Sequence, residues 1–208
     1  FIYLINCKPL NDTYFKDMLK VISEALPEYI CYIKGEDYIE AKNIISKTCG
    51  YISGNSDSLM FDKYLFLFGY QRADLFKYDT TISHNNDIDS LFNIMPTLSS
   101  DSSLSTKEMF RTIIQRGSQN GIHTIIWQDS FNAFYQNQDD KDMLPCFSMK
   151  IAFDMTQEEY SRFIGENDVS MMGENNAIYH NRSQDNQKFR PYQSPQEEWL
   201  NDVCKKLK

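Results

Sequence analysis

The sequence lacks the glycine-rich loops that hold nucleotide phosphates in many α/β proteins. Its 208 residues include only eight glycines, and neither G-x-x-x-x-G-K-[ST] nor G-x-G-x-x-G occurs among them. The nucleophile elbow G-x-S-x-G is also missing. This chain alone therefore supplies no backbone cradle for phosphates, and nothing in it favours an α/β-hydrolase.

Cysteines and histidines are few and scattered. The five cysteines include no C-x-x-C pair, and the three histidines show no metal-ligand spacing. We therefore expect reduced thiols in a cytoplasmic protein and no metal site. No apolar run approaches the length of a membrane span, and no signal peptide is visible. Because Phe1 lies inside an apolar run and is not methionine, we expect a fragment or a processed product.

Basic residues are outnumbered, with 21 Lys and Arg against 29 Asp and Glu and a net charge of -8. This balance argues against a broad nucleic-acid-binding surface, although it leaves room for a local basic strip. Hydrophobic residues make up 41% of the chain, which indicates a globular protein. The length favours a single domain, residues 1–208.

Residues 105–130 form the most informative segment. Ser105 and Glu108 match an S-x-x-E capping box, which predicts a helix start. The helix should close near a glycine and lead into a buried strand at 122–127, because that run is apolar and β-branched. Gln128 then follows the carboxyl end of the strand. In open α/β sheets ligands bind at that edge, so chemistry is expected near Gln128.

The rest of the chain alternates between apolar runs and amphipathic segments. Strands are predicted at residues 1–5, 29–33, 64–68, 122–127 and 147–153, and helices at 11–26, 36–52, 105–116, 156–165 and 194–207. Residues 177–190 read as a hairpin, and residues 77–103 and 131–142 read as exposed loops. The predicted class is α/β, a mostly parallel sheet with helices on both faces, followed by a C-terminal β-hairpin and helix.

Several segments together resemble one family. Arg116-Gly117, then Gly121-Ile122-His123 and a strand ending at Gln128, resemble the FtsK/SpoIIIE family of ring-forming motor ATPases. The resemblance extends over almost the whole chain, through residues 1–9, 64–68, 150–165 and 173–190.

The resemblance implies a RecA-type, P-loop NTPase-like fold that is incomplete here, because the phosphate loop lies ahead of Phe1. It implies the C-terminal part of an ATP-binding DNA translocase of the bacterial cytoplasm, not hydrolytic by itself. ATP and magnesium are then cofactors of the parent protein, with none expected for this chain alone. The implied partners are copies of the chain in a ring or other homo-oligomer, and double-stranded DNA through the parent.

The chain departs from the family where magnesium is normally held. The Walker B acids of the family should follow Phe68, but Gly69 and Tyr70 stand there, and Asp74 is the nearest acid. Magnesium is held through a carboxylate, which glycine cannot supply. We therefore expect weak or lost hydrolysis even in the parent protein.

Five residues are candidates for a nucleotide site. As catalytic residues, Gln128 would orient a water or sense the γ-phosphate, and Arg116 would reach a neighbouring subunit's nucleotide. The alternatives are a strand-end amide for Gln128 and a helix-dipole contact for Arg116. The expected cofactor-binding residues are Gln71, Arg72 and Asp129. Arg72 would replace the lost charge, or else pair with Asp74.

Other functions stay open. A catalytically degenerate ATPase-fold scaffold or interaction module is favoured by the missing Walker B acids, and a secretion-system ATPase domain is a further alternative. A small-molecule α/β enzyme of unrelated chemistry has no nucleophile-base arrangement to support it. Because the resemblance implies that a strand of the sheet is missing, we also expect an exposed apolar sheet edge, with self-association or a rearranged sheet.

Overall fold

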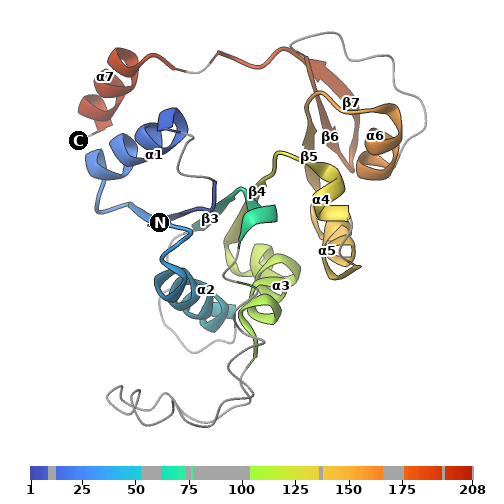
Figure 1. The fold of residues 1–208 in the computed structure, drawn as a ribbon, viewed down its shortest axis with the longest axis horizontal. Coiled ribbons are helices and arrows are strands. Elements are labelled where there is room, and N and C mark those ends of the chain that lie inside the picture. Colours follow the sequence, from blue (N-terminus) through green and yellow to red (C-terminus); the bar gives the residue numbers. More distant parts are fainter. Residues whose placement is uncertain are drawn as a thin grey trace. The chain divides into compact units, whose positions relative to one another are not determined.

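The computed structural model describes residues 1–8, 13–52, 62–73, 76, 104–135, 138–165, 176–193 and 195–207. They form two compact units, Phe1–Trp127 and Gln128–Leu207, each with its own sheet (Figure 1). The loop predicted at 77–103 lies outside the described residues. No helix in the described part of the chain is long and apolar enough to cross a bilayer.

The first unit is a four-stranded parallel sheet with the order β2-β1-β3-β4, which confirms the α/β prediction at this level. Its strands are β1 (Ile2–Asn6), β2 (Ile30–Lys34), β3 (Lys63–Phe68) and β4 (Ile122–Trp127). Its helices are α1 (Thr13–Ala25), α2 (Tyr38–Ile52) and α3 (Thr106–Arg116), with short 3-10 turns at η1 (Tyr70–Arg72) and η5 (Gly117–Asn120).

Helices cover both faces of this sheet, as the alternation predicted. On one side, here called the α1 face, Leu19 of α1 packs with Leu4, Ile30 and Phe68 of three strands. Side chains alternate along a strand, so Ile5 of β1 points to the opposite side. There α2 and α3 pack against each other and cover what we call the α2 face (Figure 1).

The capping box that begins α3 is present as predicted. The Ser105 hydroxyl accepts a hydrogen bond from the Glu108 backbone N–H at 3.2 Å, and the Ser105 backbone N–H donates to the Glu108 carboxylate at 2.8 Å. The Ser105 hydroxyl also donates to the Glu108 carboxylate at 2.8 Å. The hydrogen bonds that this carboxylate accepts, first from the Ser105 backbone and then from its hydroxyl, lower the pKa of Glu108. After η5, Gly121 takes a left-handed conformation with φ of 66°, which turns the chain into β4.

The second unit contains a three-stranded antiparallel sheet with the order β5-β6-β7. Its elements are α4 (Phe131–Tyr135), α5 (Gln138–Met143), η6 (Leu144–Cys146), β5 (Met149–Ala152), α6 (Gln157–Ile164), β6 (Ala177–Asn181), β7 (Gln184–Phe189) and α7 (Glu197–Leu207). The predicted hairpin is confirmed as β6 and β7. We expected the strand at 147–153 in the parallel sheet, but β5 pairs with β6 in this separate sheet.

The exposed loop predicted at 131–142 is wrong, because two short helices occupy most of it. The abundance of Asn, Gln and Asp there suggested a loop. However, Phe131 and Phe134 are three residues apart and both buried, as is Met143. The ring of Phe131 lies 5.5 Å from that of Phe163 on α6. Burial of these apolar side chains therefore overrides the polar composition of the segment.

Helix α6 packs on one face of the antiparallel sheet. The predicted capping box is present, with Thr156 and Glu159 bonded reciprocally. Tyr160 and Ile164 of the helix pack with Ala152 and Ile178 of two strands. The Lys150 ammonium on β5 donates to the Phe163 carbonyl at 2.7 Å, in the last turn of α6. A cation in this position complements the helix dipole.

Candidate functional site

The candidate site lies at the carboxyl edge of the parallel sheet. The chain runs from β1 outward to β2, then crosses back to β3 on the other side of β1. The order therefore reverses between β1 and β3, which is where open α/β sheets bind ligands. The residues at this point are Cys7 and Lys8 after β1, and the η1 turn after β3.

Backbone hydrogen bonds hold the strand ends in place. The Cys7 N–H donates to the Phe68 carbonyl at 2.8 Å, and the Gly69 N–H donates to the Trp127 carbonyl at 2.9 Å. The Gly35 N–H after β2 donates to the Asn6 carbonyl at 2.7 Å. The sheet ladder thus continues past the strands, so the first residues of the loops are fixed.

Two glycines are required by close backbone packing at this edge. A Cβ on Gly35 would lie 2.7 Å from both the Cα and the Sγ of Cys7. Gly69 has a φ of 70°, and a Cβ there would lie 3.1 Å from the Lys8 backbone nitrogen. Non-glycine residues rarely adopt such a φ. Glycine at position 69 is therefore required by the backbone, and an acidic residue would be strained there.

Asn6 shapes the turn after β1. Its side chain is buried, with 8% of its surface exposed. The side-chain carbonyl accepts from the Lys8 N–H at 3.0 Å, and its amide donates to the Tyr32 hydroxyl at 3.2 Å. The Lys8 ammonium lies 5.8 Å from the centre of the Trp127 ring, within the range of a cation–π contact.

Gln71 and Arg72, two predicted cofactor-binding residues, both lie in η1 at this edge. The turn is anchored by Tyr70, which is buried and stacks on Phe110 of α3 with ring centroids 6.0 Å apart. The Arg72 side chain is exposed, whereas Gln71 is half-buried. Arg72 is therefore accessible to solvent in the turn that follows β3.

The other three predicted residues are not part of the loops that follow β1 and β3. Arg116 ends α3 just before η5 and β4, at the amino edge of the sheet. A six-residue strand separates that edge from η1, which is about 20 Å. Gln128 and Asp129 follow β4 and begin the second unit. The Gln128 amide donates to the Ser130 carbonyl at 2.9 Å, a local contact that matches the strand-end alternative.

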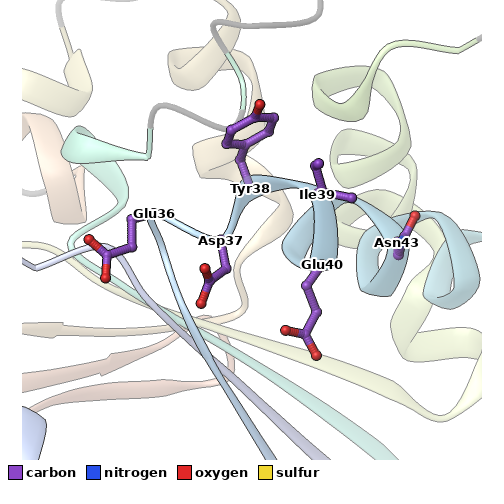
Figure 2. Close-up of a pocket in the computed structure, with 6 residues that line it drawn as sticks. All are labelled: Glu36, Asp37, Tyr38, Ile39, Glu40 and Asn43. Carbon is purple, nitrogen blue, oxygen red and sulfur yellow. The ribbon is translucent and has the colours of Figure 1, made fainter. Parts of the chain in front are cut away.

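A hollow of about 370 Å³ lies at the start of α2, on the β2 side of this edge (Figure 2). It is lined by Glu36, Asp37, Tyr38, Ile39, Glu40 and Asn43. In Figure 2 the Tyr38 ring points away from the carboxylates of Asp37 and Glu40. The Lys34 ammonium lies 3.9 Å from the Glu36 carboxylate, so it offsets one of the three acids. This acidic hollow repels phosphate, whereas Lys8 and Arg72 supply positive charge at the β1 and β3 ends.

Sequence reasoning missed Asn6 and Lys8 as residues of this edge. The available signal was the Asn-x-Lys step directly after a predicted strand, since asparagine favours such turns. Gly69, which follows β3, has no side chain that could hold a magnesium ion. Among the described residues, no group of three or more His, Cys, Asp or Glu side chains is arranged to hold a metal.

Comparison with known proteins finds no match to any family model, curated protein or solved structure.

Proposed function

We propose that residues 1–208 are the C-terminal part of an FtsK/SpoIIIE-like ATP-binding DNA-translocase domain that does not hydrolyse ATP by itself. The observation that carries this proposal is the hydrogen bond from the Gly69 N–H to the Trp127 carbonyl. The resemblance assigns these two strand ends to the Walker B and sensor positions. Their bond supports the assignment, because a nucleotide site needs both positions at one edge.

The topology supports the same proposal. Strands β3 and β4 are parallel neighbours over their whole length, from Lys63 opposite Ile122 to Phe68 opposite Trp127. The η1 turn extends β3 at the edge where α/β sheets bind ligands. ATP, when bound by the parent protein, supplies the phosphoryl group whose release drives movement. In this chain, Arg72 would bind and orient the phosphates, and copies of the chain and double-stranded DNA are the proposed partners.

The proposal is tested on the polypeptide that also contains the residues preceding Phe1. Arg72→Ala should weaken ATP binding measured by calorimetry about tenfold or more, because charge-assisted hydrogen bonds to phosphate are lost. The matched control is Arg190→Ala, which removes an exposed arginine from the second unit and should leave binding unchanged. Equal affinities for both variants and the parent would remove Arg72 from the site.

One observation favours the second candidate, a degenerate ATPase-fold scaffold. The left-handed backbone at Gly69 and its close approach to Lys8 exclude a carboxylate from the Walker B position without strain. If this chain binds nucleotide without turnover, the nucleotide would act as a structural ligand of the assembly. Absence of ATP binding by the longer polypeptide would favour the scaffold over the translocase.

A further inference from the structure

The Lys8 side chain lies along the carboxyl edge of the parallel sheet. Lys8 follows β1, and its ammonium lies 5.8 Å from the centre of the Trp127 ring, which ends β4. In the order β2-β1-β3-β4, strands β1 and β4 are separated by β3, a distance of about 10 Å. The side chains of Lys8 and Trp127 therefore meet across the end of β3.

Gly69, the first residue after β3, makes room for this crossing. A Cβ at position 69 would lie 3.2 Å from the Lys8 Cγ and 3.1 Å from the Lys8 backbone nitrogen. A side chain there would have to displace the Lys8 stem. The missing side chain at Gly69 and the path of Lys8 are therefore two parts of one arrangement.

The backbone of Lys8 is held by contacts from neighbouring strands. Its N–H donates to the side-chain carbonyl of Asn6 at 3.0 Å, and the Asn6 amide donates to the Tyr32 hydroxyl of β2 at 3.2 Å. The preceding residue, Cys7, donates its N–H to the Phe68 carbonyl of β3 at 2.8 Å. A lysine held in this way loses less freedom when it binds a ligand.

The Lys8 ammonium supplies the kind of charge that a metal ion supplies at a phosphate site. Magnesium is held through oxygen ligands, and in the described part of the chain no three His, Cys, Asp or Glu side chains are grouped to hold a metal. A lysine ammonium is a compact point charge with three donors, and it binds phosphate oxygens directly. A magnesium ion beside this ammonium would be repelled by it.

We propose that the Lys8 ammonium takes the place of a divalent cation at this edge, so that a polyphosphate is bound through lysine without magnesium. Gly69 gives the lysine stem its passage, and the Trp127 ring is a surface on which the ammonium rests before the ligand binds. The inference rests on the proposed function in taking a nucleotide polyphosphate as the ligand, and it names the group that neutralises its charge.

The test uses the fluorescence of Trp127 in residues 1–208. The chain contains two tryptophans, so Trp199→Phe leaves Trp127 as the single reporter. Inorganic triphosphate that binds the Lys8 ammonium changes the surroundings of the ring beside it. We expect a saturable change in emission at millimolar triphosphate in the presence of a metal chelator, and we expect that added magnesium does not strengthen the binding.

Three further variants in the same background identify the group that binds. Lys8→Met keeps the stem, removes the charge and should weaken triphosphate binding at least about tenfold. Lys34→Met, the matched control, removes an exposed ammonium from the end of neighbouring β2 and should leave the affinity unchanged. Gly69→Ala should also weaken binding, because its methyl group would displace the Lys8 Cγ. Circular dichroism checks that each variant is folded, and Lys8→Met decides the outcome if Gly69→Ala is not.

Three results would overturn the proposal. The first is the absence of a saturable change at millimolar triphosphate. The second is binding that requires magnesium, since a metal ion then supplies the charge. The third is equal affinity of Lys8→Met and its parent, since the phosphate then binds elsewhere.

ATP binding separates this inference from the proposed function. Triphosphate binding that depends on Lys8 in residues 1–208, without ATP binding by the longer polypeptide, supports the lysine site and contradicts the translocase proposal. ATP binding by the longer polypeptide that requires magnesium and is unaffected by Lys8→Met contradicts the lysine site alone.

Discussion

In the strands of the parallel sheet, the exposed large hydrophobic residues lie on one face of β3 and β4, at Tyr64, Ile125 and Trp127. In the antiparallel sheet they line β5 itself, where Met149 and Ile151 point away from the cluster under α6. An antiparallel sheet tolerates one open face, but a parallel sheet is built from crossover units that cover both. Exposed apolar side chains are therefore expected on the outer face of the antiparallel sheet, and they are less usual on a parallel sheet.

Truncation in the two sheets should have very different consequences. Leu65→Ala on β3 removes a side chain with no exposed surface and should destabilise the first unit by about 3 kcal/mol, because it leaves a cavity. Ile151→Ala on β5, which is 48% exposed, should cost less than about 1 kcal/mol. Urea unfolding checks both values. A similar loss at both positions would show that the outer face of β5 is buried in solution.

A pair of glycine substitutions tests whether the backbone requires glycine at position 69, the proposed Walker B position. Gly69→Asp should destabilise the protein by about 1–3 kcal/mol, because of its left-handed φ and the close Lys8 backbone, and should not produce magnesium-dependent hydrolysis. Gly50→Ala in α2, with nothing within 4 Å of its added Cβ, should stabilise by about 0.5 kcal/mol. Thermal unfolding and a phosphate-release assay measure these effects. Hydrolysis gained by Gly69→Asp would contradict the account.

Each unit contains one capping box, and removing either box should have a smaller effect on the free energy of unfolding. Ser105→Ala and Thr156→Ala should each cost about 1 kcal/mol in unfolding free energy, because each leaves a helix N–H without its acceptor. Amide exchange should show the loss in α3 for the first variant and in α6 for the second. Loss in both helices from either single variant would show that the two units unfold together.

The pH dependence of the two units should have the same sign but fall in different pH ranges, and these are the smallest expected effects. The pKa of Glu108 is lowered by its Ser105 hydrogen bonds, so its contribution is present at neutral pH and lost as pH falls through that lowered value. Burial lowers the pKa of Lys150, and the positive charge of Arg182 lowers it further. The second unit should therefore gain stability as pH rises from that lowered value toward 10.5, the ordinary value.

Two variants check these slopes. Glu108→Gln should flatten the acid slope of the first unit, and Lys150→Met should flatten the alkaline slope of the second, both followed by unfolding at a series of pH values. An unchanged slope in either variant would assign the pH dependence to other groups.

Local patterns in the sequence predicted the local structure well. The strands of the parallel sheet lie within a residue or two of their apolar runs, and both capping boxes formed, because these features depend on neighbouring residues. The assignment of β5 to a separate sheet was not predictable, since an apolar run does not reveal its pairing partner. The helices at 131–142 were missed because only two buried phenylalanines, Phe131 and Phe134, distinguish them from a polar loop.

The candidate site was predictable only in part. The positions of Gln71 and Arg72 followed from a strand end, which the apolar run at 64–68 indicated. The contributions of Asn6 and Lys8 depend on contacts between β1, β2 and β4, which are distant in sequence. The need for glycine at Gly69 depends on the Lys8 backbone in the same way.

The most direct test of the central claim is ATP binding, measured by calorimetry with magnesium, to the unsubstituted polypeptide that includes the residues preceding Phe1. The account predicts tight binding followed by slow or no turnover. No binding at millimolar ATP would contradict the proposed ATPase ancestry of the site and leave the scaffold as the function of this fold.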